Sequence, residues 1–80
     1  MKVIHYNGSR NIVGDRVREA RQRAGLSQAM LCARMQTEGV AITQDALSRI
    51  ESGGRLVQDF ELKALAHCLQ VTVDWLLDNE

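Results

Sequence analysis

The stretch Thr43–Gly53, which reads TQDALSRIESG, predicts one short amphipathic helix, because it carries the signals for both ends of that helix. Thr43 is a favourable N-cap, since its hydroxyl accepts a hydrogen bond from a backbone N–H two or three residues later. Gly53 favours the left-handed conformation that stops a helix. One face of this helix is apolar and is made of Ala46, Leu47 and Ile50. We therefore expect this face to pack and the polar face to remain free for a contact.

Patterns on either side of this segment predict four more helices, at about 12–24, 27–39, 59–69 and 72–78. The chain has no proline, and Gly25 and Gly39 stand where the first two helices would end. Ser27, Asp59 and Thr72 are the expected N-caps of the second, fourth and fifth helices. The fold class expected is all-α, a compact five-helix bundle with a short N-terminal arm.

Residues 1–10 stand apart from the expected helices. The letters KVIHY alternate weakly, and the turn signal Asn7-Gly8 follows them. Two interpretations stay open: the segment is an N-terminal arm, or it is a dimerising strand that pairs with the same segment of a second chain. In either case residues 11–80 form the rest of the domain.

Length and composition limit the classes of protein that the chain can belong to. Eighty residues are near the lower limit for a single apolar core, so we expect Trp75 to anchor that core. The 45% apolar and 25% charged fractions are ordinary for a globular protein. The sequence contains neither the roughly 20-residue apolar run of a membrane span nor a secretory signal, which makes a cytoplasmic location the default.

Residues with catalytic or metal-binding chemistry are sparse. No nucleophile–base pair or phosphate loop is present, so we expect no enzymatic activity and no cofactor. Cys32 and Cys68 are 36 positions apart and fall inside expected helices, which favours buried free thiols. With His5 and His67 they lack the usual ligand spacing of a zinc site, and we expect no metal.

Charge is unevenly distributed along the chain although the formal net charge is zero. Residues 1–34 carry seven Lys or Arg and two Asp or Glu, a net charge of +5, whereas the remainder carries three and eight, a net charge of −5. A basic half can bind a polyanion even when the total charge is zero. The alternative is a basic helix face that is only solvated.

Three motifs follow one another in a characteristic order. They are R-x(4)-L-S-Q at 21–28, L-S-R-I-E-S-G at 47–53 and L-x-V-T-V-D-W-L-L at 69–77. Together they resemble the lambda-repressor and Cro-like helix-turn-helix family over residues 12–77. The resemblance implies a bundle whose third helix, about 43–52, enters the major groove of DNA, while the second helix lies across the phosphate backbone.

The resemblance also assigns roles on the third helix. The residues expected to meet base edges are Gln44, Asp45, Ser48 and Arg49. Glutamine can bind adenine and arginine can bind guanine through two hydrogen bonds. Asp45 has two open interpretations: it accepts a hydrogen bond from a cytosine amine, or it only favours the helix N-terminus.

Contacts to phosphates are expected from the second helix and from arginines outside the third helix. The resemblance places Gln28 at a phosphate, where it also braces the recognition helix, unless it is only a solvated helix start. The phosphate set is Ser27, Gln28, Arg16, Arg18 and Arg55, with Arg10 and Arg23 as further candidates. For each arginine taken singly, a solvated surface role is the alternative.

Two further expectations concern structure. Arg21 and Glu51 occupy positions that form a partly buried ion pair in many relatives, so both are assigned to structure. The chain also departs from the family pattern, because 15 positions separate Gln28 from Thr43 whereas relatives place the equivalents about ten apart. The extra residues either extend the second helix and loop back or tilt the recognition helix.

The resemblance implies a sequence-specific double-stranded DNA-binding transcriptional regulator that acts as a homodimer on a palindromic site. The alternative is a protein-interaction module on the same fold, of the antitoxin or anti-repressor type, which the neutral net charge and Asp45 favour.

Overall fold

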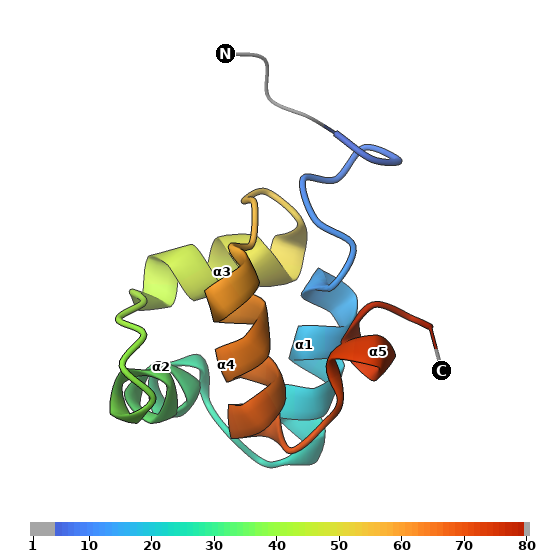
Figure 1. The fold of residues 1–80 in the computed structure, drawn as a ribbon. Coiled ribbons are helices and arrows are strands. Elements are labelled where there is room, and N and C mark those ends of the chain that lie inside the picture. Colours follow the sequence, from blue (N-terminus) through green and yellow to red (C-terminus); the bar gives the residue numbers. More distant parts are fainter. Residues whose placement is uncertain (1–4, 80) are drawn as a thin grey trace.

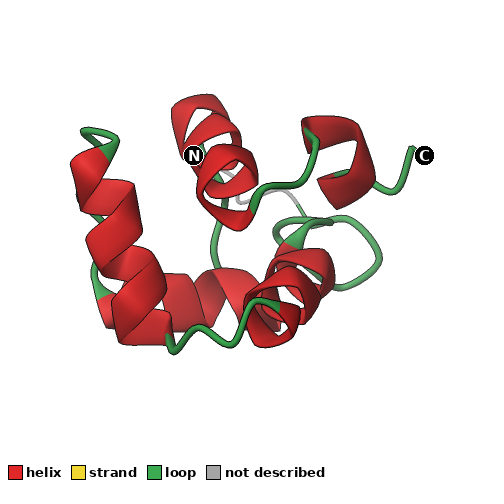
Figure 2. Ribbon diagram, turned by 90° about the horizontal axis from the view of Figure 1, so that it is seen from below, coloured by secondary structure: helices red, strands yellow, loops and turns green. Residues whose placement is uncertain are grey.

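A computed structural model describes residues 5–79, and these residues form five helices with no β-strand beyond one isolated bridge. The helices are α1 (Gly14–Arg23), α2 (Gln28–Thr37), α3 (Gln44–Ser52), α4 (Asp59–Leu69) and α5 (Val73–Leu76) (Figure 1). Figure 2 shows that loops alone connect them. The predicted all-α class is therefore confirmed. Within this part of the chain, no helix is long and apolar enough to span a bilayer.

The three hydroxyl N-caps form as predicted. The side chains of Ser27, Thr43 and Thr72 each accept a hydrogen bond of 3.0 Å from the backbone N–H three residues later. Gly53 adopts the left-handed conformation, with a φ of 82°, and ends α3. Local capping thus accounts for the starts of α2, α3 and α5.

Two helix starts differ from the prediction. Helix α1 begins at Gly14 rather than near Ile12, because Asn11 Oδ1 accepts the backbone N–H groups of Val13 and Gly14 at 3.1 and 2.8 Å. The helix therefore begins about two residues later than expected.

Helix α4 is preceded by Gln58, so the prediction of Asp59 as its cap was wrong. The carboxylate of Glu61 accepts the Gln58 backbone N–H at 2.9 Å, which is one half of a capping box. The Asp59 carboxylate instead accepts the N–H of its neighbour Phe60 at 2.7 Å.

Helix α4 lies in the middle of the bundle and contacts α1, α2 and α5 (Figure 1). The largest completely buried side chains come from all five helices and are Val17, Leu31, Met35, Leu47, Ile50, Leu65 and Leu76. Burial of each such side chain contributes about 1.5–3 kcal/mol. Leu76, rather than Trp75, anchors α5 in this core, and Trp75 packs half-buried at its edge.

The connection from Gln28 to Thr43 consists of α2, which ends at Thr37, and of a loop over residues 38–43. Gly39, with a φ of 81°, turns the chain directly after α2. Val40 and Ile42 are half-buried and pack against the core, so the loop is anchored on the way to α3.

The described part of the N-terminal segment is attached to the end of α3. The predicted turn at Asn7-Gly8 is confirmed, with φ angles of 51° and 80° and an antiparallel bridge between Tyr6 and Ser9. The backbone N–H of Arg10 then donates to the carbonyl of Gly53 at 2.8 Å. The start of the expected strand, residues 1–4, lies outside the described residues.

Candidate nucleic-acid interface

Helix α3 divides into a buried face and an exposed face. Leu47 and Ile50 are completely buried, and each holds the helix against the core. The four side chains predicted to meet base edges are all exposed, and they are Gln44, Asp45, Ser48 and Arg49. Packing on one side thus leaves the polar side of α3 free for a partner.

Two of these exposed residues contact each other. The carboxylate oxygen Oδ2 of Asp45 lies 3.3 Å from Nε of Arg49, one helical turn later, and both side chains are largely exposed. Neither interpretation of Asp45 from the sequence includes this ion pair. The Asp45 carboxylate lies beside a cation of its own helix.

The Arg21–Glu51 pair joins α1 to α3. Arg21 donates to the Glu51 carboxylate through Nε at 2.7 Å and through Nη2 at 2.9 Å. The hydrogen bond to Glu51 raises the pKa of Arg21 and outweighs the opposing effect of burial. Gln28 Nε2 donates to the same carboxylate at 3.2 Å, so one buried acid connects α1, α2 and α3.

Three of the predicted contact residues surround one pocket of about 180 Å³ beside this cluster. Arg18 comes from α1, Gln28 from α2 and Ser48 from α3, and the Arg21–Glu51 pair forms part of the wall. Ser27 directly precedes Gln28 and is exposed at the start of α2. The structure therefore brings Arg18, Gln28 and Ser48 together although they lie far apart in the sequence.

Arg16 lies elsewhere, against α5. Its guanidinium donates to the carbonyl of Trp75 at 3.2 Å and to the carboxylate of Asp78 at 2.5 Å. It also lies 4.5 Å from the centroid of the Trp75 ring, a cation–π distance. Arg23 approaches the same ring at 5.9 Å. Both arginines therefore contact the helix that closes the bundle.

Arg55 is held by Glu61 through two parallel hydrogen bonds of 2.9 Å each. Glu61 is buried, and its hydrogen bond to Arg55 is the main cause that lowers the pKa of its carboxyl, against the effect of burial. The same bond raises the pKa of Arg55. This pair orders the loop between α3 and α4.

Sequence reasoning missed Asn11. Its Nδ2 donates to the carbonyls of Ile50 and Arg55 at 3.0 and 2.8 Å, at the end of α3. Next to it, a Cβ added to Gly14 would lie 2.3 Å from the Ile50 carbonyl oxygen, so only glycine fits there. A lone Asn-Ile pair before a helix carries no signal for contacts made 39 and 44 positions away.

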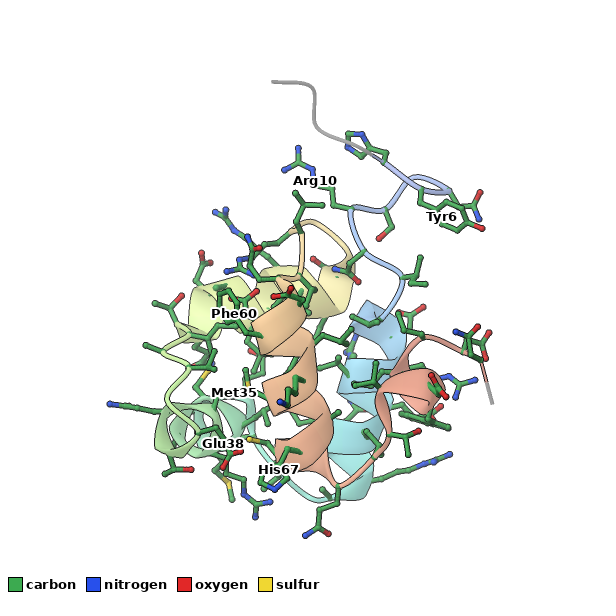
Figure 3. All side chains as sticks on the ribbon, viewed as in Figure 1. Tyr6, Arg10, Met35, Glu38, Phe60 and His67 are labelled. Atoms are coloured by element: carbon green, nitrogen blue, oxygen red, sulfur yellow. The ribbon has the colours of Figure 1, made fainter. Side chains whose placement is uncertain are left out.

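Three of the candidate metal ligands, Cys32, His67 and Cys68, lie on α2 and α4 rather than on α3. Cys32 is half-buried and Cys68 is buried, and burial raises the pKa of both thiols. His67 contacts the Glu38 carboxylate, and Figure 3 shows the two side chains together at one end of α4. Across residues 5–79, no three His, Cys, Asp or Glu side chains gather to hold a metal ion.

A family model matches most of the chain. The family model described as helix-turn-helix covers residues 17–76, which is three quarters of the chain. This range includes α2, α3 and the Arg21–Glu51 pair. No curated protein matches the chain.

Proposed function

The chain belongs to the lambda-repressor-like helix-turn-helix family of DNA-binding domains, and from this premise we propose that it is a sequence-specific transcriptional regulator. It acts on double-stranded DNA in the cytoplasm. Helix α3 enters the major groove, and the start of α2 lies at the phosphate backbone.

The observation that carries this proposal is the exposed face of α3 on a braced helix. Gln44, Ser48 and Arg49 are exposed, while the buried Glu51 ties the same helix to Arg21 and Gln28. A rigid helix with exposed amide and guanidinium groups suits the reading of base edges. Each two-bond contact of this kind discriminates against a wrong base by about 1–3 kcal/mol.

Phosphate contacts come from residues that border this face. Arg18 and Gln28 share a pocket with Ser48, and Ser27 opens α2, whose N-terminal N–H groups favour anions. Arg18 is favoured over Arg16 and Arg55, because those two guanidiniums already pair with carboxylates. Arg10 is exposed, beside the loop that follows α3.

Salt dependence tests the proposal. The dissociation constant is measured for a pool of genomic DNA fragments between about 50 and 200 mM salt. We expect the logarithm of the affinity to fall linearly with the logarithm of the salt concentration, with a slope of about −0.9 for each phosphate contacted. Absence of binding at the lowest salt would overturn the proposal and favour the protein-interaction alternative.

The proposal includes a homodimer, because two α3 helices that are related by a two-fold axis and lie one helical turn of DNA apart match a palindromic site. Residues 1–10 are the candidate dimerising segment, and Tyr6 in it is 63% exposed. Light scattering measures the molar mass of the full chain and of a variant that lacks residues 1–8. Ser9 is retained because it donates to the Gly53 carbonyl at 3.2 Å. If the number of chains per particle, calculated from the molar mass, is the same for both proteins, this segment is excluded as the dimer contact.

A further inference from the structure

We propose that Asp45 is a positioning residue for Arg49, and that the pair makes Arg49 a reader of guanine. This inference rests on the proposed function, because it assigns the base that one side chain of α3 recognises.

The geometry of the ion pair determines which donors remain free. The contact is an ion pair that brings Asp45 Oδ2 to 3.3 Å from Nε of Arg49, so the carboxylate lies beside the inner edge of the guanidinium. Among the described residues, no other contact of the Arg49 guanidinium is recorded. The two terminal nitrogens, Nη1 and Nη2, are therefore available as a fork of donors.

A fork of two coplanar N–H donors matches guanine better than any other base. Guanine presents two acceptors, N7 and O6, side by side in the major groove, whereas adenine presents a donor beside its N7. Arginine bound through both donors favours guanine by roughly 5- to 150-fold over other bases. The free end of Arg49 has the chemistry for this contact.

Asp45 contributes by restricting the arginine before DNA arrives. The Arg49 side chain is 66% exposed, and its packing alone leaves the guanidinium poorly restrained. On a helix, an acidic side chain four residues before a basic side chain is the favourable order for such an ion pair. An exposed pair at this spacing is weak, so the restriction it imposes is worth up to about twofold in affinity for the correct partner.

The pair also explains how an acid is tolerated on a face proposed to meet DNA. An isolated carboxylate there is repelled by phosphates, whereas Asp45 is partly neutralised by Arg49 and lies in the first turn of α3, where the helix dipole favours an anion. Removal of Asp45 thus has two opposite effects. Binding to DNA of any sequence strengthens, and discrimination at one base weakens.

The chain contains a matched control for the charge change. Glu19 and Arg23 form another exposed pair at the same spacing and the same 3.3 Å distance, on α1 rather than on α3. Glu19→Ala removes one negative charge, as Asp45→Ala does, without disturbing the exposed face of α3. Asp45→Glu keeps the charge and restores a pairing partner for Arg49.

The test uses the full chain and a DNA duplex that the wild-type protein selects from a random library. Each guanine of that duplex is replaced in turn by 7-deazaguanine, which lacks the N7 acceptor but still pairs with cytosine, and each cytosine by N4-methylcytosine, which lacks the free amine N–H. Dissociation constants are measured for the wild type, Asp45→Ala, Asp45→Glu and Glu19→Ala. We expect Asp45→Ala to lose up to about twofold of the preference for one guanine. The variant should remain folded with a slightly lower thermal stability, because the first turn of α3 loses a favourable anion. Glu19→Ala retains the full preference, and Asp45→Glu restores it.

Three outcomes would overturn the inference. In the first, Asp45→Ala keeps the full guanine preference. In the second, it loses a preference for cytosine instead, which assigns Asp45 to direct base contact. In the third, the Nε–H resonance of Arg49 in the DNA-free protein is unchanged by Asp45→Ala, so the pair does not form. Failure of the wild type to select any sequence would instead refute the proposed function, on which the inference depends.

Discussion

The side-chain amide of Asn11 donates to the carbonyl of Ile50 at 3.0 Å and to that of Arg55 at 2.8 Å, while its oxygen accepts two N–H groups at the start of α1. One side chain therefore joins the start of α1 to the end of α3. Gly14 permits this contact, because a Cβ there would collide with the Ile50 carbonyl oxygen.

Replacement of Asn11 by aspartate tests this joint. The carboxylate still accepts the two N–H groups, but it cannot donate to Ile50 and Arg55. The Arg55 carbonyl therefore loses its Asn11 donor, and the Ile50 carbonyl keeps only the backbone N–H of Gly53. We expect the free energy of unfolding to fall by about 1–3 kcal/mol, as measured by urea denaturation. Asn79→Asp makes the same charge change at an exposed residue and controls for it. Equal stability of the two variants would contradict the role given to Asn11.

The Arg21–Glu51 pair predicts strong coupling between two substitutions. The two side chains are 12% and 5% exposed, so Glu51→Leu alone leaves an unpaired buried guanidinium and costs about 3–5 kcal/mol. Arg21→Met combined with Glu51→Leu removes both charges and is expected to recover most of that loss. Thermal or urea unfolding of the two single variants and the double variant measures the coupling. Additive losses would show that the pair does not form.

Stability is expected to depend on pH through Glu61. The hydrogen bond from Arg55 holds the pKa of this carboxyl below its ordinary value of 4.5, so the folded protein binds the proton less readily than the unfolded chain. The stabilisation is complete above pH 4.5 and is lost as pH falls through the lowered pKa of the folded state. Urea unfolding between pH 7 and pH 3 measures it. In Glu61→Gln this part of the acid loss should vanish, and an identical pH profile would contradict the assignment.

Arg16 and Arg18 are predicted to have different roles although they are two residues apart. Arg16→Ala removes the contacts to Trp75 and should change the fluorescence of this single tryptophan and lower stability by about 0.5–2 kcal/mol. Arg18→Ala should leave fluorescence unchanged and flatten the salt slope of DNA binding by about 1. The two variants serve as controls for each other. The reverse pattern would place Arg16, and not Arg18, at the phosphates.

Local patterns in the sequence predicted the features of the fold that depend on neighbouring residues. The hydroxyl caps at Ser27, Thr43 and Thr72 and the left-handed Gly53 act within one helical turn, so their effect can be read from a few letters. The cap of α4 was misassigned because aspartate is usually a better cap than glutamine. In α4, the hydrogen bond from the Gln58 backbone N–H to the Glu61 carboxylate makes Gln58 the cap instead.

Contacts between distant segments were beyond such patterns. Arg16 meets Asp78 across 62 positions, and nothing near either residue distinguishes this arginine from Arg18. The same holds for Asn11 and Ile50, 39 positions apart. The Asp45–Arg49 contact is local, and the i, i+4 spacing of an acid and an arginine is the signal that could have predicted it.

An NMR titration shows whether the exposed face of α3 binds DNA. Backbone and side-chain amide signals of the ¹⁵N-labelled chain are followed while a duplex selected by the protein is added. We expect the largest shifts on Gln44, Ser48 and Arg49 and on the side-chain amide of Gln28, with little change in α5. Shifts confined to α4 and α5, or no shifts at all, would contradict this expectation.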